Sequence, residues 1–166
     1  MTPPYDINII ADYTILSLTA DEKPTDLINL KLQKLMYYIQ GWHLGYKKTR
    51  IIDSAFEAWV HGPVSRKLYD RFKDTKTLYS YIDRTDVVNN DAYDKIQEDD
   101  RKFIDYILYN YASFSGVELE QKTHEEYPWQ KTREGLHPLV ACNKEIDDNL
   151  IIEYFSEKWD NLYGKN

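Results

Sequence analysis

The sequence predicts a mainly α-helical protein, a compact bundle of about six helices with at most a short β-hairpin or extended segment near residues 55–61. Apolar residues recur at intervals of three and four along most of the chain, the spacing that places them on one face of a helix. Only the stretch AFEAWV, residues 55–60, alternates as a strand does. No internal repeat and no Pro/Gly/Ser-rich linker divides the 166 residues, so we expect a single domain, residues 1–166.

Two helices are expected in the first third of the chain. The apolar spacing of residues 7–18 predicts a first helix, with Asp6 as its N-cap and an end before Pro24. Residues 30–46 predict a second helix, with Asn29 as its cap.

The second helix has a wide apolar face and an opposite polar side. Gly41 and Gly45 weaken its C-terminal end, which indicates either a close approach by another element or a helix that finishes near Tyr46. Three residues are expected on the polar side: Lys31, Lys34 and Gln40.

A short strand or extended segment is expected at residues 55–60, followed by a turn at Gly62-Pro63. Proline is well suited to the first position of a helix, so Pro63 is expected to open a helix over residues 63–73. Three of its residues are expected to face inward: Val64, Leu68 and Phe72.

Three further helices are expected in the second half. The first covers residues 98–114. The second has about ten residues, begins at the Ser115 capping box and ends near Tyr127-Pro128. The third covers residues 148–163 and is capped by Asp147. The acidic residues 83–100 predict a solvated connection that contains a short turn or hairpin, and residues 129–135 predict a short turn.

Several function classes are excluded or made less favourable by the sequence. Cys142 is the only cysteine, which excludes an intramolecular disulfide and a cysteine-based zinc site. No signal-peptide pattern is present and no apolar run is long enough to span a bilayer, so we expect a cytoplasmic protein without a membrane partner. Glycine-rich nucleotide motifs and the G-x-S-x-G motif are absent, and no cofactor is expected.

Charge is unevenly distributed along the chain. The net charge is −7, yet residues 31–76 hold ten Lys and Arg against four Asp and Glu. The overall acidity argues against a nucleic-acid partner, because phosphate binding depends on basic surface. The basic window can still steer an anionic partner, and a protein surface fits as well as a phosphate backbone.

The four histidines supply one alternative function. His124 precedes Glu125, but no second histidine follows at the i+4 position, so the zinc-protease motif is not formed. Residues distant in sequence can assemble a site, and a metal-assisted hydrolase using His61, His124 and Glu125 therefore stays open as an alternative. No local spacing supports it, so we expect no catalytic residue, no metal site and no enzyme activity. His43, on an apolar helix face, is expected to be a core histidine.

The aromatic content indicates a binding role. Fifteen tyrosines and four tryptophans are more than six short helices need for a core, and amphipathic aromatic residues dominate protein interfaces. Trp59, Tyr69, Tyr79 and Tyr81, near the Gly62-Pro63 turn, are candidates for such a role, with ordinary core packing as the alternative.

Four sequence blocks occur in an order that resembles a known family. They are LKLQKLMYYIQGWHLGY, AFEAWVHGPVSRKLYDRFK, VELEQKTHEEYPWQKTREG and IDDNLIIEYFSE. With the preceding residues they extend from about residue 7 to residue 155 and resemble the Panacea domain of SocA-like antitoxins and phage-associated GepA-like proteins. The resemblance implies a compact helical domain that neutralises a toxin encoded beside it by direct binding, with delivery to a host protease as a further route.

The resemblance also implies which residues meet the partner, expected to be a cognate toxin. An alternative is a phage or mobile-element protein that binds a host defence factor in the same way. The matching blocks point to Gln33 and Lys34 without distinguishing binding from fold maintenance. Eight residues are predicted to contact the partner: Trp59, His61, Gly62, Pro63, Tyr69, His124, Glu125 and Trp129.

Overall fold

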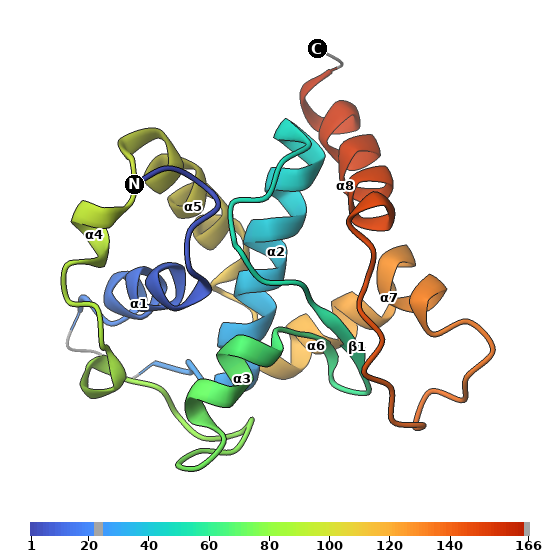
Figure 1. Cartoon of the computed structure of the whole chain (residues 1–166), viewed down its shortest axis with the longest axis horizontal. Coiled ribbons are helices and arrows are strands. Elements are labelled where there is room, and N and C mark those ends of the chain that lie inside the picture. The colour runs from blue at the N-terminus through green and yellow to red at the C-terminus, as the bar shows by residue number, and fades with distance from the viewer. Residues whose placement is uncertain (22–24, 165–166) are drawn as a thin grey trace.

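The computed structural model describes residues 1–21 and 25–164, so Pro24, expected to follow the first helix, lies outside the described residues. Within them the chain forms eight α-helices and one two-stranded antiparallel sheet, which confirms the mainly helical class (Figure 1). The elements are α1 (Ile7–Leu18), α2 (Asn29–Lys47), β1 (Glu57–Trp59), β2 (Gly62–Val64), α3 (Arg66–Phe72), the 3₁₀ turn η1 (Arg84–Asp86), α4 (Ala92–Lys95), α5 (Glu98–Tyr111), α6 (Gly116–His124), α7 (Tyr127–Thr132) and α8 (Asp148–Tyr163). No helix of the described residues has the length and apolar character that a membrane crossing requires.

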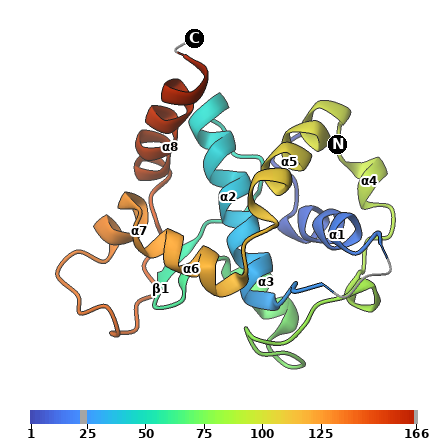
Figure 2. The same ribbon diagram turned by 180° about the vertical axis from the view of Figure 1, so that it is seen from behind.

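Helix α2 runs through the middle of the molecule, and the other elements surround it (Figures 1 and 2). Helices α1, α5, α6 and α8 and strand β2 all pack on it, and every residue from Asn29 to Gly45 is buried. A helix enclosed in this way has no solvent-facing side. The expected polar side is therefore wrong, because Lys31, Lys34 and Gln40 are 2%, 0% and 1% exposed.

The buried polar side chains of α2 are used to hold other segments of main chain. Gln33 donates to the Ser65 carbonyl at 3.1 Å and accepts from the Ser65 amide at 2.9 Å. Gln40 likewise donates to the Ile52 carbonyl at 3.0 Å and accepts from the amides of Ile51 and Ile52. Since buried polar groups must be hydrogen-bonded, these two glutamines, seven residues apart, fix both ends of the segment 51–65, which contains the hairpin.

Two further polar residues of α2 also make hydrogen bonds inside the molecule. The ammonium of Lys31 lies 2.6 Å from the Asp26 carboxylate and 2.6 Å from the Ala112 carbonyl. His43 is buried, as expected, and its Nδ1 lies 2.6 Å from the carbonyl oxygen of Thr49.

The two glycines near the end of α2 permit a close approach by α8, which confirms the first of the two expectations for them. A Cβ at Gly41 would lie 2.6 Å from the ring of Phe155. A Cβ at Gly45 would lie 2.6 Å from the main-chain carbonyl carbon of Phe155. A side chain at Gly45 would push α8 away from α2, and one at Gly41 would displace the ring of Phe155.

Two predicted helix starts are wrong. Pro63 lies in β2, and α3 begins at Arg66 after Ser65, whose hydroxyl accepts from the Leu68 amide at 3.3 Å. The helix cannot begin earlier because Pro63 is paired with β1. Asn29 is the first residue of α2 and not its cap, and its side-chain amide donates to the Thr77 carbonyl at 3.3 Å.

The second half contains more helix than expected. The predicted turn at 129–135 is largely helix α7, in which Pro128 occupies the first turn, where a missing amide proton is tolerated. The connection 83–100 contains η1 and α4. The other starts are confirmed: α5 begins at Glu98, and Ser115 and Asp147 cap α6 and α8 through their side chains.

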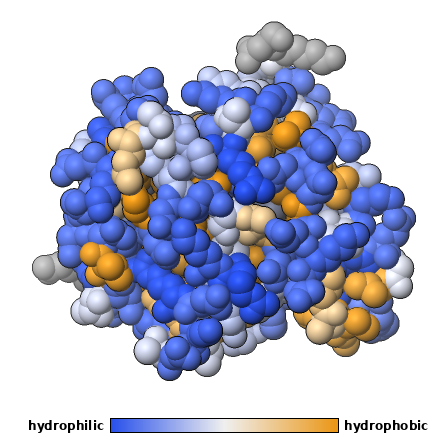
Figure 3. Space-filling model, in the orientation of Figure 1, coloured by the Kyte–Doolittle hydropathy of each residue, from blue (hydrophilic) through white to orange (hydrophobic). Residues whose placement is uncertain are grey.

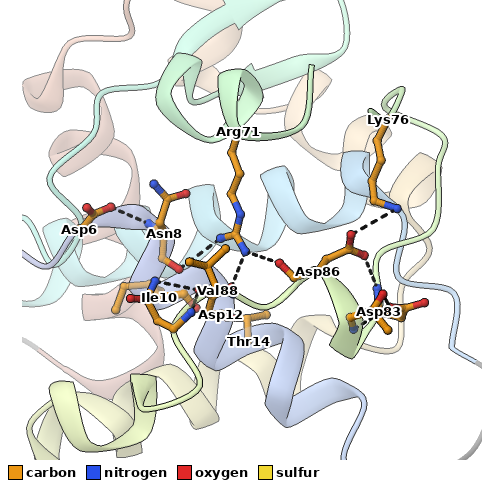
Figure 4. A network of polar contacts seen from close by, with 12 residues as sticks. Asp6, Asn8, Ile10, Asp12, Thr14, Arg71, Lys76, Asp83, Asp86 and Val88 are labelled. Carbon is orange, nitrogen blue, oxygen red and sulfur yellow. Dashed lines mark hydrogen bonds and ion pairs between the residues drawn. The ribbon is translucent and has the colours of Figure 1, made fainter. Parts of the chain in front are cut away.

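The connection around η1 is held in place by one buried ion pair (Figure 4). The guanidinium of Arg71 on α3 donates to the Asp12 carboxylate of α1 at 2.6 Å and to the Asp86 carbonyl at 2.8 Å. The other Asp12 oxygen accepts from the amide of Asn89 at 2.8 Å. Asp12 is fully buried, so it joins α1, α3 and the irregular segment where few apolar contacts are available.

Candidate protein-interaction surface

The hairpin formed by β1 and β2 is short and closes tightly. Trp59 pairs with Gly62 across the two-residue turn 60–61. Gly62 has a φ of +87°, in the left-handed region that favours glycine. A Cβ at Gly62 would also lie 2.6 Å from the hydroxyl oxygen of Thr123. The glycine therefore allows both the turn and the close approach of α6.

Four side chains hold the main chain of the hairpin from beneath. Each donates a hydrogen bond to one carbonyl, and the donors come from α2, α6, α7 and the residue after α7. The pairs are Lys34 Nζ with Pro63 at 3.0 Å, His124 Nε2 with Val60 at 2.8 Å, Trp129 Nε1 with Trp59 at 2.8 Å and Arg133 Nη1 with Ala58 at 2.8 Å. Because buried hydrogen bonds are costly to leave unmade, these contacts keep the hairpin rigid.

The outer side of the hairpin carries an aromatic and basic cluster. The rings of Trp59 and Tyr69 meet edge to face with centroids 4.9 Å apart. The Arg66 guanidinium lies 4.8 Å from the Trp59 ring centroid and 3.3 Å from the Glu57 carboxylate, which also accepts from the Trp59 indole at 2.7 Å. Arg66 is exposed and the two aromatic residues are half-buried. Rigid aromatic groups beside an exposed arginine are the residues enriched at the energetic centre of protein interfaces.

A long loop between α7 and α8, residues 133–147, lies beside this cluster. Arg133 donates to the carbonyls of His137, Pro138 and Val140 at 3.3, 3.2 and 2.5 Å. The other end of the loop pairs with β1, because the Ala58 amide donates to the Lys144 carbonyl at 2.8 Å. The loop is thus fixed at both ends.

Between these fixed ends the loop exposes apolar side chains. Leu136, Leu139 and Val140 are 43%, 76% and 45% exposed. Figure 3 shows apolar side chains at the lower right, where this loop lies in Figure 1. A cleft of about 480 Å³ separates the loop from the hairpin and is lined by Trp59, Val60, His61, Arg66, Ala141, Cys142 and Asn143. We call the cluster, the cleft and the exposed loop residues the hairpin face.

The eight residues predicted to contact a partner fall into three groups. Gly62, Pro63 and Trp129 are buried and support the hairpin face from within. Glu125 is exposed, after the end of α6. The other four are half-buried and lie at or under the hairpin: Trp59, His61, Tyr69 and His124. Tyr79 and Tyr81 are exposed, but their segment pairs with Ile28 and not with the hairpin.

The two histidines of the hydrolase alternative meet at Glu120 and not at Glu125. His61 Nδ1 and His124 Nε2 lie 3.8 and 3.9 Å from the carboxylate of Glu120, whereas the Glu125 side chain makes no hydrogen bond or ion pair with either histidine. Burial lowers the pKa of His124, and Nε2 of its ring donates a hydrogen bond to the Val60 carbonyl. Because Nε2 carries the proton that it donates, only Nδ1 of this ring keeps a lone pair that could bind a metal. Among residues 1–21 and 25–164 there is no cluster of three His, Cys, Asp or Glu that could hold a metal ion.

Lys34 is the titratable group most strongly affected by its position under the hairpin. It is fully buried, and burial lowers its pKa to about 7, an effect that the negative charge of Glu120 opposes. In the unfolded chain the same group titrates near 10.5. Between these pH values the unfolded chain binds a proton that the folded chain does not, so unfolding becomes less favourable as the pH rises.

Lys34→Met is expected to remove this dependence on pH. As the pH rises from 7 to 10, the free energy of unfolding of the wild type should increase relative to that of Lys34→Met by a few kcal/mol, on the order of 2–4. Urea titrations at half-unit pH steps measure it. If the free energies of unfolding of the two proteins changed with pH in parallel, burial would not lower the pKa of Lys34.

Sequence reasoning missed two features of the hairpin face. Arg133 lies in the segment expected to be a turn, and its partners are carbonyls, which leave no trace in the residue pattern. The exposed apolar loop did have a signal, because Leu136, Leu139 and Val140 lie in the apolar run GLHPLVAC, between a glycine and a polar segment. Such a run outside any helix or strand indicates surface exposure of apolar groups.

Fold and surface together define a helical domain with a rigidly supported, partly apolar hairpin face. Residues 32–130 match the model of the family described as antitoxin SocA-like, Panacea domain. The chain belongs to this family. Comparisons with curated proteins and with solved structures find no significant match. The matched range runs from α2 to α7 and includes the hairpin with all its supporting groups except Arg133, while the exposed part of the α7–α8 loop lies beyond it.

Proposed function

We propose that this protein is an antitoxin that neutralises a cognate toxin by binding it directly through the hairpin face. The observation that carries the proposal is the exposure of Leu136, Leu139 and Val140 on a loop fixed at both ends, beside the Trp59 cluster. Exposed apolar groups held in one conformation bind with little loss of conformational entropy. Membership of an antitoxin-like family supports a toxin as the partner.

The two parts of the hairpin face are suited to different tasks. The hairpin and its supporting groups lie almost entirely within the range shared with the family, so they provide a common platform. The exposed loop lies outside that range, so it is suited to recognising this chain's own partner. Arg66 on the platform is exposed and basic, which favours an acidic group of the toxin opposite the Trp59 cluster.

Co-expression tests the proposed function. We expect the neighbouring gene to encode a protein that arrests growth when expressed alone. When both proteins are expressed, it should become harmless and co-purify with this chain. Neutralisation without a stable complex would contradict direct binding, and a harmless neighbour would contradict the toxin as partner.

Trp59→Ala is expected to abolish most of this rescue while the protein stays folded. The half-buried indole contributes area at the centre of the hairpin face, and truncation of such an aromatic anchor costs about 2 kcal/mol or more of binding. The measurement is growth rescue together with the thermal midpoint of the purified variant. Tyr109→Ala, at a side chain that is 87% exposed on α5, is the matched control and should rescue like the wild type.

A further inference from the structure

A second concave region lies away from the hairpin face and is lined by residues of α5, α6 and α8. Figure 2 shows where these three helices lie. Two hollows of about 260 and 360 Å³ adjoin there, and both are lined by Trp42, Tyr111, Lys122 and Leu162. The Trp42 indole donates to the Tyr111 hydroxyl at 2.8 Å, so the aromatic floor is held in one arrangement. We call this region the α5–α8 groove.

Two lysines of the groove have no anionic partner. Lys122 of α6 and Lys158 of α8 make neither an ion pair nor a hydrogen bond with any described residue. Their ammonium groups instead lie over aromatic rings, 4.4 Å from the centroid of Phe114 for Lys122 and 4.9 Å from that of Tyr154 for Lys158. Both lysines line the larger hollow, so it presents two positive charges above an apolar floor.

The single carboxyl group of the larger hollow does not neutralise these charges. Oε2 of Glu126 accepts from the Tyr38 hydroxyl at 3.0 Å, while Oε1 is buried and has no hydrogen-bond partner among the described residues. Burial raises the pKa of Glu126 to about 7, against the opposing effect of Lys158 and Lys122. Near neutral pH this carboxyl is therefore only partly ionised, and the hollow keeps a net positive charge.

We propose that the α5–α8 groove binds a carboxylate carried on an apolar group. The ammonium groups of Lys122 and Lys158 receive the negative charge, and the rings of Trp42 and Tyr111 contact the apolar carrier. A cation is excluded because it would meet two positive charges. The carrier can be a free organic acid or an acidic side chain between apolar residues of a protein.

The test uses the whole chain and two small probes of opposite charge. 3-Phenylpropionate should shift the indole N–H resonance of Trp42 saturably, with a Kd in the millimolar range, and 2-phenylethylammonium should not. The peptide acetyl-Phe-Glu-Phe-amide distinguishes the two sources: tighter binding than 3-phenylpropionate assigns the groove to a protein side chain, and weaker binding assigns it to a free acid. No response to either acid, or an equal response to the amine, overturns the proposal.

Substitutions separate the roles of the charged groups. Lys122→Gln combined with Lys158→Gln should weaken 3-phenylpropionate binding about tenfold. Lys102→Gln, which changes an exposed lysine of α5 paired with Glu98, should leave binding unchanged. Glu126→Gln should tighten binding at pH 8, where the wild-type carboxylate repels the probe. Equal binding by the double variant and the wild type overturns the proposal, provided that thermal unfolding shows both to be folded.

Discussion

Gly45→Ala is expected to lower the free energy of unfolding by about 3 kcal/mol or more, although alanine favours helix over glycine by about 1 kcal/mol. The new Cβ would lie 2.6 Å from the main-chain carbonyl carbon of Phe155. Main chain cannot rotate out of the way as a side chain can, so α8 must move off α2. The contact of α2 with α8 is the most extensive between any two elements, and its separation would open the centre of the molecule.

Gly41→Ala is the matched comparison, because both glycines lie on α2 against the same residue. The Cβ at Gly41 would meet the ring of Phe155 at 2.6 Å. Phe155→Leu should therefore recover part of the stability lost in Gly41→Ala and recover none in Gly45→Ala. Urea unfolding of the three single and two double variants measures this. Equal recovery in both would show that α8 adapts freely to α2.

Arg133→Met is expected to cost about 3 kcal/mol of stability and to free the α7–α8 loop. Arg133 is 3% exposed, lies 5.0 Å from the Trp129 ring centroid and donates to four carbonyls. Methionine fills a similar volume but donates nothing, so the carbonyl of Ala58 loses its arginine donor and the start of the loop loses its anchor, while the end at Lys144 stays paired with β1. Lysine would restore a charge but not the planar fork that reaches several carbonyls together.

Amide hydrogen exchange of residues 134–143 and urea unfolding measure the two effects of Arg133→Met. Exchange should quicken in the loop and in β1 while α5 and α8 keep their protection. Arg84→Met, at an exposed arginine with one hydrogen bond to the Thr19 carbonyl, should change stability by less than about 0.5 kcal/mol. Unchanged exchange in the loop of Arg133→Met would contradict the role given to this side chain.

The features that sequence could predict are the local ones. The caps of Asp6, Ser115 and Asp147 involve residues two or three positions away, so the pattern contains the whole interaction. The close approach at Gly41 and Gly45 could be predicted because small residues inside a helix have few other uses. The short helix α7 was missed because its six residues are too few to repeat the 3.6-residue apolar spacing by which a helix is recognised.

The features that sequence could not predict depend on contacts between distant segments. The polar residues Lys34 and Gln40 of α2 indicate a solvent face by pattern, but their partners lie 29 and 12 residues away. Similarly, the sequence pattern around Pro63 is typical of a helix start, and only its pairing with β1 shows that it lies in a strand. At the hairpin face, Trp59 could be predicted from its residue type, whereas Arg133 and the exposed loop required the folded chain. Those long-range contacts position the proposed binding groups.

The affinity of the purified toxin for Leu139→Asp tests the central claim most directly. Leu139 is 76% exposed at the tip of the loop, so aspartate should leave the thermal midpoint unchanged and yet weaken binding about 100-fold, because a charge replaces an apolar contact in the interface. Tyr109→Asp on α5 is the control and should bind like the wild type. Calorimetric titration that gives Leu139→Asp the affinity of the wild type would contradict the hairpin face as the toxin-binding surface.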